Sequence, residues 1–475
     1  KGNEKSKNNR YQYLFEEILK QKKYDEQKLI AKLGYSANPN GFSVAKNYLY
    51  QLLLRCLRNY NNNSRSAQMQ VAELLIDVEI LYRKGLFKNC FKLLQKGIRI
   101  ATKFDLTIYH LTLLRWETQL SYYLNETVEL SKKYESLFSE RQQLLQAVTN
   151  ESGLECQYLD ARVNGELDCD SPTLGQLEKD NITIRARYAF YSFRDIHYRS
   201  NRQGEQGYRS NLEAMEYFEK IPAFRENYKE LHLEIIYNYL KSMLVTNRFD
   251  QFAQEHQRLL TFKVPPPHHH LKLLKDCLVM NLLSTYHTYK GQFSRVIDEI
   301  LPQYNHYLQR RIKVRFLKRE IWTMGMISWT LLALKRREES FEWLMMAEQD
   351  IDRNIHEDQY LLFRFLALAL HFELENFRLM ESINKSLQRF MDLRNKDNAV
   401  EINFLKFSRK VANPSIDRAV RMKALRKLRA DLLSIDIEVM RESTIKVFSL
   451  VNWINRNLGD DPRRYYNLDD LPDQP

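Results

Sequence analysis

Three consecutive histidines, His268, His269 and His270, are the most obvious candidate metal ligands in this chain. Three prolines precede them in VPPPHHHLK, residues 264–272. Successive residues of a helix point about 100° apart, so adjacent histidines on one helix do not converge on a single ion. Proline blocks continuation of a helix and restricts the residue before it. We therefore interpret the stretch as a stiff corner between two helices, with the histidines in the first turn of the second.

A second candidate is HEDQY at 356–360, which begins like the HExxH helix of a zinc protease. Tyr360 occupies the place of the second histidine, so the pair of ligands that zinc needs on one helix face is missing. The chain has no GxGxxG or GxxxxGK[ST] loop for phosphate and no GxSxG nucleophile elbow. We therefore expect no enzymatic activity, no metal site and no cofactor.

The cysteines also argue against a metal or disulfide framework. There are five of them, an odd number, and no CxxC pair occurs. Cys169 lies in the loop-like segment LDCDSP and is the one thiol whose reactivity is worth testing. The other four, Cys56, Cys90, Cys156 and Cys277, are interpreted as buried or incidental thiols.

Composition favours helices over sheets. The 475 residues include 13 glycines and 11 prolines, far below average use of roughly 7% and 5%, and sheets need many tight turns built from these residues.

The net charge of +13 permits an acidic peptide, nucleic acid or anionic lipid as partner. No apolar run approaches the ~18 residues of a membrane helix, and no secretory signal is visible. We expect a cytoplasmic protein without membrane insertion.

Helix pairs recur along the sequence. In residues 72–104, Gly85 breaks a helical pattern and Phe87 opens the next helix. The same landmark position is predicted at Phe249, Phe293, Arg337 and Phe377, at intervals of 44, 44 and 40 residues, and at Tyr208, 41 residues before Phe249. One such hairpin cannot bury its own apolar face, so consecutive hairpins are expected to stack into a solenoid.

The pattern of a glycine or substitute, then an aromatic, then a small residue is typical of tetratricopeptide-like hairpins. Residues 70–130 and 205–392 thus resemble the tetratricopeptide superfamily. FSVAKNYLYQLLLRCLRNY, VEILYRKGLFKNCFKLLQKGIRIA and EINFLKFSRKV with NWINRNL are similar to a family of uncharacterised bacterial helical-repeat proteins without an assigned activity. The resemblance implies an all-α, right-handed superhelical solenoid of stacked antiparallel helix pairs, acting as a cytoplasmic scaffold or regulator.

Five segments are predicted along the chain. Long helices are indicated at 137–167, and the clearest linker is LDCDSPTLG at 167–175. The segments are an N-terminal helical cap (1–66), a first repeat segment with long helices (67–170), the main repeat array (171–392), a C-terminal helical cap (393–460) and a polar tail (461–475).

In the family that the chain resembles, the first helix of each hairpin lines the concave surface, and its polar residues often hold a peptide carboxylate. Counting back 12 and 8 residues from the landmarks predicts a peptide-binding strip of Tyr237, Lys241, Asn281, Thr285 and Trp329. Lysine would supply charge, asparagine would bond the peptide backbone, and tryptophan would be an apolar anchor. The alternative is that these side chains only pack the long repeats internally.

Nucleic acid is the alternative partner. The excess positive charge is densest in 308–320 and 418–431. On a continuous helix the basic residues of the first segment would share a face and contact phosphates. The residues of this alternative surface are Arg311, Arg315, Lys318, Arg319, Arg426 and Lys427. No base-reading motif accompanies them, so a protein or peptide partner is preferred, and solvated helix faces remain a third interpretation.

Overall fold

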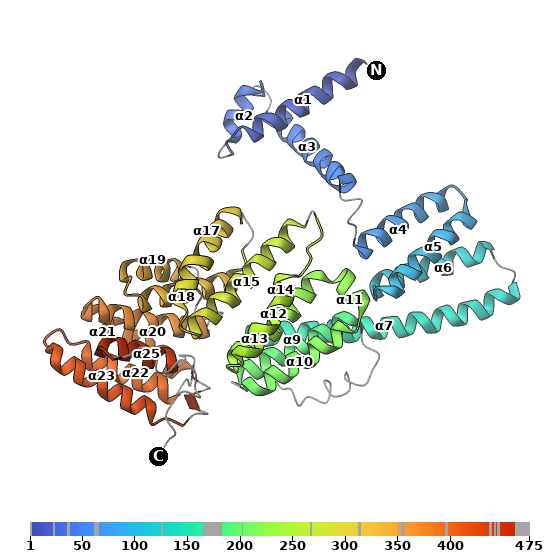
Figure 1. The fold of residues 1–475 in the computed structure, drawn as a ribbon. Coiled ribbons are helices and arrows are strands. Elements are labelled where there is room, and N and C mark those ends of the chain that lie inside the picture. Colours follow the sequence, from blue (N-terminus) through green and yellow to red (C-terminus); the bar gives the residue numbers. More distant parts are fainter. Residues whose placement is uncertain are drawn as a thin grey trace. The chain divides into compact units, whose positions relative to one another are not determined.

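The chain forms helices throughout the part that the structure describes (Figure 1). The structure is a computed structural model that describes residues 2–21, 24–35, 39–60, 66–124, 127–164, 183–201, 203–266, 268–311, 315–349, 351–352, 357–394, 398–436, 439–440, 443 and 447–460. All regular secondary structure in these ranges is helical. The predicted all-α class is therefore confirmed.

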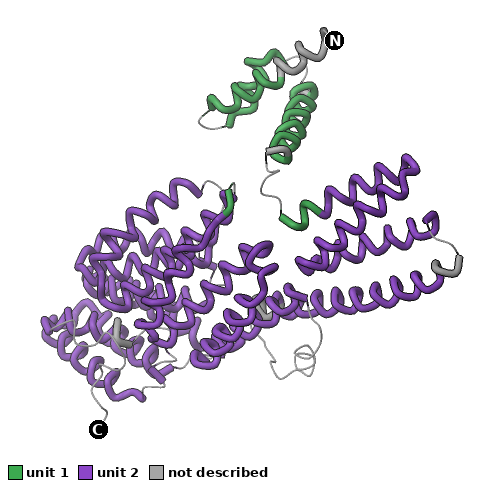
Figure 2. The backbone as a smooth tube through the Cα atoms, turned by 45° about the vertical axis from the view of Figure 1, so that its right-hand side comes forward, with its two compact units in different colours: residues 1–70, 265–267 green, residues 71–264, 268–475 purple. Residues whose placement is uncertain are grey.

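Two compact units divide the chain (Figure 2), residues 1–70 with 265–267 and residues 71–264 with 268–475. The first unit contains α1 (Gly2–Leu19), α2 (Glu26–Lys32), α3 (Pro39–Tyr60) and the first four residues of α4 (Ala67–Arg83). Asp25 caps α2, because its Oδ1 accepts a hydrogen bond from the Lys28 amide at 3.0 Å. Proline at the first position of α3 suits a helix start, since that amide has no partner within the helix.

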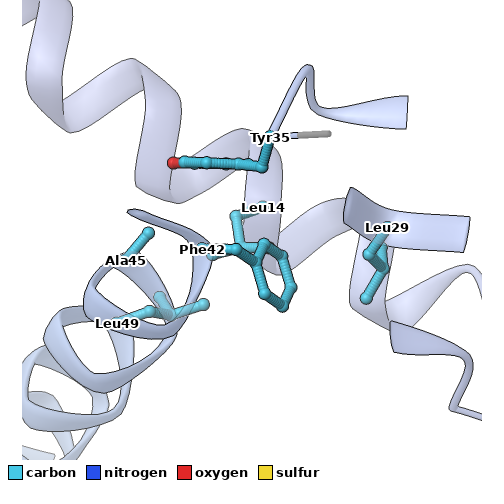
Figure 3. Packing of buried hydrophobic residues seen from close by; sticks show 6 residues of the cluster. All are labelled: Leu14, Leu29, Tyr35, Phe42, Ala45 and Leu49. Carbon is cyan, nitrogen blue, oxygen red and sulfur yellow. The ribbon is translucent and has the colours of Figure 1, made fainter. Parts of the chain in front are cut away.

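The first unit has its own small apolar core (Figure 3). Phe42, Ala45 and Leu49 stand three and four residues apart on one face of α3 and are buried. Leu14 of α1 and Leu29 of α2 complete this core from the other two helices. The spacing of apolar residues on α3 thus fixes which face of that helix is covered.

The second unit is mainly a series of helix pairs. They are α4 (Ala67–Arg83) with α5 (Phe87–Lys103), α6 (Thr107–Leu124) with α7 (Thr127–Asn164), α9 (Ile184–Ser200) with α10 (Gly204–Glu219), α12 (Lys229–Val245) with α13 (Phe249–Glu255) and α14 (Gln257–Leu260), α15 (His269–Tyr289) with α16 (Phe293–Arg295), the π-helical turn η2 (Val296–Ile300) and α17 (Leu301–Arg310), α18 (Leu317–Ala333) with α19 (Arg337–Glu348), α20 (Glu357–Glu373) with α21 (Phe377–Leu393), and α22 (Ala399–Val411) with α23 (Arg418–Leu433). The short helix α11 (Pro222–Asn227) precedes α12, and α25 (Val447–Leu458) follows the last pair. First helices contact the next first helix in order, α12 with α15, α15 with α18 and α18 with α20.

One backbone turn joins the two helices in five of these pairs. A residue with φ between 58° and 71° stands two positions before the second helix, at Gly85, Asn247, Gly291, Lys335 and Glu375. The following amide bonds back to the first helix, as from Leu86 to the Leu81 carbonyl at 3.0 Å and from Arg336 to the Leu331 carbonyl at 2.9 Å. This is the Schellman ending of a helix. The predicted landmarks are confirmed as first residues of second helices, at Phe87, Phe249, Phe293, Arg337 and Phe377.

The predicted landmark at Tyr208 is wrong. The second helix of that pair, α10, begins at Gly204, and Tyr208 lies one turn inside it. This helix has a glycine at its first position instead of an aromatic residue, so the aromatic pattern indicated a residue four positions too late.

The corner predicted at VPPPHHHLK is confirmed where it is described. α14 ends at Leu260, and α15 begins at His269 with His268 at its N-cap. His268, His269 and His270 are all exposed. Pro265 and Pro266 lie between the two helices, and Pro267 lies outside the described residues.

Other predictions concern segments at the edges of the described ranges. The linker at 167–175, Cys169 and the tail at 461–475 lie outside them. α4 begins one residue after the boundary predicted at 66, and α7 is a single helix of 38 residues, as the long-helix pattern indicated. Of the described cysteines, Cys90 and Cys277 are buried, and Cys56 and Cys156 are exposed. The remaining segment boundaries stay predictions.

Glycine is required where α18 meets α20. A Cβ atom added to Gly325 would lie 2.0 Å from a ring carbon of Phe363. Phe363 is fully buried, so its ring has little room to move away. The absence of a side chain at position 325 therefore sets how closely these two first helices approach.

None of the described helices combines the length and apolar character that crossing a bilayer requires.

Candidate functional site on the first helices

The five predicted strip residues lie on three neighbouring first helices (Figure 1). Tyr237 and Lys241 belong to α12, Asn281 and Thr285 to α15, and Trp329 to α18. The Tyr237 hydroxyl donates to Asn281 Oδ1 at 2.9 Å. The structure thus joins α12 and α15 through two of the predicted side chains.

Asn281 is held from both sides. Its Nδ2 donates to the carbonyl oxygen of Arg319 at 3.0 Å and to Thr323 Oγ1 at 3.2 Å, both on α18. Burial raises the pKa of Tyr237 to about 12, so its hydroxyl keeps the proton that it donates to Asn281. These polar groups cross-link three helices and are satisfied within the protein.

The tryptophan that contacts the strip is Trp322 rather than Trp329. Trp322 Nε1 donates to Thr285 Oγ1 at 2.9 Å, and Thr285 Oγ1 donates to the Asn281 carbonyl at 2.7 Å. Trp322 is partly exposed, whereas Trp329 is 8% exposed. Seven residues separate them on one helix, so they share a face. Counting back from Arg337 reached only Trp329, one of two candidates on that face.

An ion pair crosses the middle helix of the three. Arg319 on α18 bonds Glu234 on α12 through Nη2 and Oε2. The Arg319 guanidinium also stands 5.0 Å from the centre of the Tyr237 ring. Both ion-pair side chains are partly exposed. The pair therefore marks a face where α12 and α18 reach each other over α15.

Lys241 is the basic member of the strip. Its side chain is partly exposed, and its ammonium group has no hydrogen bond or ion pair within the described part of the chain. Burial lowers the pKa of Lys241 to about 7, as do the cations of Arg199, Lys318 and Arg319, whereas Asp195 acts in the opposite direction. Near pH 7 this amine is therefore poised between its neutral and charged forms.

Nearby charges do not neutralise Lys241 directly. On α9, Asp195 pairs with Arg199 at 3.2 Å. On α18, Arg319 is occupied by Glu234. An anion that reached Lys241 would relieve the repulsion from the surrounding cations and favour the charged amine.

The predicted basic strip in 308–320 does not form one helix face, and that prediction is wrong. α17 ends at Arg310, residues 312–314 lie outside the described ranges, and α18 starts at Leu317. Only Lys318 and Arg319 share a helix.

The other two arginines of the predicted basic strip, Arg311 and Arg315, contact a buried carboxylate. Glu320 is fully buried and is 2.6 Å from Arg311 Nη1 and 3.6 Å from Arg315 Nε. The Tyr307 hydroxyl donates to Glu320 Oε1 at 2.7 Å. Since an unpaired buried charge is costly, these arginines stabilise the fold. Arg426 and Lys427, by contrast, are exposed on α23 and make no ion pair in the described structure.

Metal ligands do not converge within the described residues, where no group of three or more histidine, cysteine, aspartate or glutamate side chains could hold an ion.

No protein-family model matches the chain, and no curated protein is detectably similar to it. The resemblance to tetratricopeptide-like proteins therefore stays a prediction.

Proposed function

We propose that this chain is a non-enzymatic, cytoplasmic scaffold or regulator that binds a protein or peptide partner. Its hairpins would stack into a right-handed superhelical solenoid, and the partner would lie on the concave surface formed by the first helices. The chain-order contacts from α12 through α15 and α18 to α20 support such stacking.

The ion pair between Arg319 and Glu234 is the observation that carries the proposal. Axes of packed helices lie about 8–10 Å apart, so α12 and α18 would be roughly 16–20 Å apart if α15 lay flat between them. A direct pair between their side chains favours a layer that bends toward this side. We infer that the face bearing Arg319, Glu234 and Lys241 is the concave one.

The chemistry of that face suits a peptide with a carboxylate. Lys241 supplies an uncommitted amine, and the partly exposed Trp322 is fixed by its bond to Thr285. Aromatic side chains held rigidly in this way are favourable anchors for a partner. Tyr237 and Asn281, whose polar groups bond each other, would position these two residues rather than bind the partner themselves.

Affinity purification from the source cell tests the proposal, using nuclease-treated lysate and mass spectrometry. Three baits are compared, the unaltered chain, Lys241→Gln and Lys272→Gln. Lys272 is an exposed lysine on α15 and serves as the matched control. A partner recovered by the unaltered chain and by Lys272→Gln, but lost with Lys241→Gln, supports binding at the strip. Recovery of the same proteins by all three baits, or of none, would contradict it.

Nucleic-acid binding through 308–320 and 418–431 is the alternative function. Its surviving support is the exposure of Arg426 and Lys427 on α23. A gel-shift titration at low and high salt with Arg426→Gln/Lys427→Gln decides it. Steeply salt-dependent binding that this variant abolishes would favour the alternative. Binding that the variant leaves unchanged, or no binding at low salt, would remove these residues as the basis for it.

A further inference from the structure

The second helix of the first hairpin, α5, carries positive charge only. Residues 80–104 contain seven lysines and arginines and no aspartate or glutamate. Cys90, Leu94, Gly97 and Ala101 form its buried face. The opposite face presents Lys88, Lys92, Lys96 and Arg99, all exposed. We refer to these four residues as the α5 stripe.

The α5 stripe is regular and uncompensated. Its members stand four, four and three residues apart, so that consecutive charges are separated by about 4.5–6 Å along the helix axis. None of the four makes an ion pair within the described structure, whereas the flanking Arg83 and Lys103 pair with Glu79 and Glu226. A solvated helix face in a folded protein commonly mixes both signs of charge, and this one does not.

An aromatic cluster lies at the first turn of the stripe, where α4, α5 and α6 run side by side (Figure 1). Phe87 and Tyr123 are stacked with centroids 4.5 Å apart, and Tyr82 lies 5.3 Å from Trp116. Tyr122 packs against Tyr123 at 5.4 Å and is itself 69% exposed. The ring contacts thus join α4, α5 and α6, and the cluster presents the Tyr122 ring to solvent.

From this juxtaposition we propose that the α5 stripe and the aromatic cluster bind single-stranded nucleic acid. Evenly spaced cations would follow the phosphates, and a base would stack on the exposed face of Tyr122. A basic track beside an aromatic platform is the arrangement that sequence-tolerant single-strand binding uses. This surface shares no residue with the peptide-binding strip, so the two proposals can be tested separately.

The stripe fits a polynucleotide better than an anionic membrane. A basic amphipathic helix binds a bilayer by inserting its apolar face. The apolar face of α5 is already buried, and the Cys90 thiol lies 3.5 Å from the Val78 carbonyl of α4. The α5 stripe therefore presents charge along the helix, but α5 has no exposed apolar face that could insert into a bilayer.

Fluorescence anisotropy with a labelled 20-nucleotide oligo(dT) or oligo(U) strand and the full chain tests the proposal. Lys88→Gln/Lys92→Gln/Lys96→Gln removes three exposed charges without removing a packed side chain. We expect at least a tenfold loss of affinity, and a plot of log affinity against log salt that is shallower by about 2. Tyr122→Ala should weaken binding about fivefold or more through lost stacking.

The matched control, Arg378→Gln/Lys406→Gln/Lys410→Gln, neutralises three exposed cations of α21 and α22 and lowers the net charge equally. It should bind like the unaltered chain. No binding of either strand at 50 mM salt would overturn the proposal, as would equal losses in the two triple variants. Competition by poly-glutamate or phosphatidylserine vesicles, charge for charge as effective as unlabelled strand, would show a general polyanion or membrane surface instead.

Discussion

Asp105 is a partly buried carboxylate in the turn between α5 and α6, where it adopts a φ of 52°. Its carboxylate accepts a hydrogen bond from the amide of Ile184, at the start of α9. Burial raises the pKa of Asp105 to about 6, the Ile184 amide opposes this, and the Glu151 carboxylate raises it further. The turn therefore connects two hairpins through a group that titrates in a mildly acidic range.

Ionised Asp105 is expected to destabilise the folded chain. Because its folded pKa lies above the ordinary 3.8, the stability that the protonated form supplies is present below about pH 4 and is lost as pH rises through about 6. Asp105→Asn should raise the free energy of unfolding by about 1–3 kcal/mol at pH 8 and change it little at pH 4. Asparagine tolerates this φ and still accepts from Ile184. Urea-unfolding midpoints across this pH range measure the effect, and parallel curves for both proteins would contradict it.

Lys241 should react as a neutral amine near pH 7. An ordinary lysine has a pKa of about 10.4 and is almost fully charged there, whereas burial lowers that of Lys241 to about 7. Competitive acetylation across pH, read by mass spectrometry, should give a half-maximal rate near pH 7 for Lys241. A half-maximal rate near the ordinary lysine value of about 10.4 would contradict the prediction.

At the scale of elements, the turns between helices are more uniform than their sequences. Glycine occupies the positive-φ position at Gly85 and Gly291, but Asn247, Lys335 and Glu375 adopt the same conformation. Most residues other than glycine and asparagine are sterically strained in this left-handed conformation. The stacking of hairpins, rather than local preference, must hold Lys335 and Glu375 in place.

Exchanging residues at these turns should change stability in opposite directions. Lys335→Gly should increase the free energy of unfolding by up to about 1 kcal/mol by relieving left-handed strain. Gly85→Ala should reduce it by about 1–2 kcal/mol, for conformational reasons alone, because nothing lies within 4 Å of the added Cβ. Thermal unfolding of the two variants checks the pair. A stabilised alanine variant or a destabilised glycine variant would refute the argument.

Contact between α18 and α20 depends on Gly325. Gly325→Ala should cost about 1–3 kcal/mol through overpacking against Phe363. Gly153→Ala in α7 is the matched control, because its added Cβ meets nothing within 4 Å and alanine favours a helix interior by about 1 kcal/mol. Thermal denaturation should separate the two variants in opposite directions, and equal shifts would indicate that α18 and α20 adjust freely.

For the whole molecule, periodicity and the spacing of turns predicted the helices and most hairpin starts. The aromatic pattern failed at Tyr208, because α10 opens with Gly204. The basic strip failed because α17 ends at Arg310 and α18 starts at Leu317, so Arg311 and Arg315 lie between the helices, where they pair with the buried Glu320. Trp322 and the Arg319–Glu234 pair were not predicted, because both depend on contacts between different helices. The Trp322–Thr285 contact joins residues 37 positions apart, and the Arg319–Glu234 pair joins residues 85 positions apart. The α5 stripe, in contrast, can be recognised from the sequence alone.

The central claim is that the first helices form a concave face that holds a protein partner. Photo-crosslinking in the source cell tests it most directly, with benzoylphenylalanine replacing Trp322 on α18 or, in a second variant, Met345, which is exposed on the second helix α19. The account predicts a discrete cross-linked protein from position 322 and none from position 345. Cross-linking from position 345 alone, or from neither position, would contradict it.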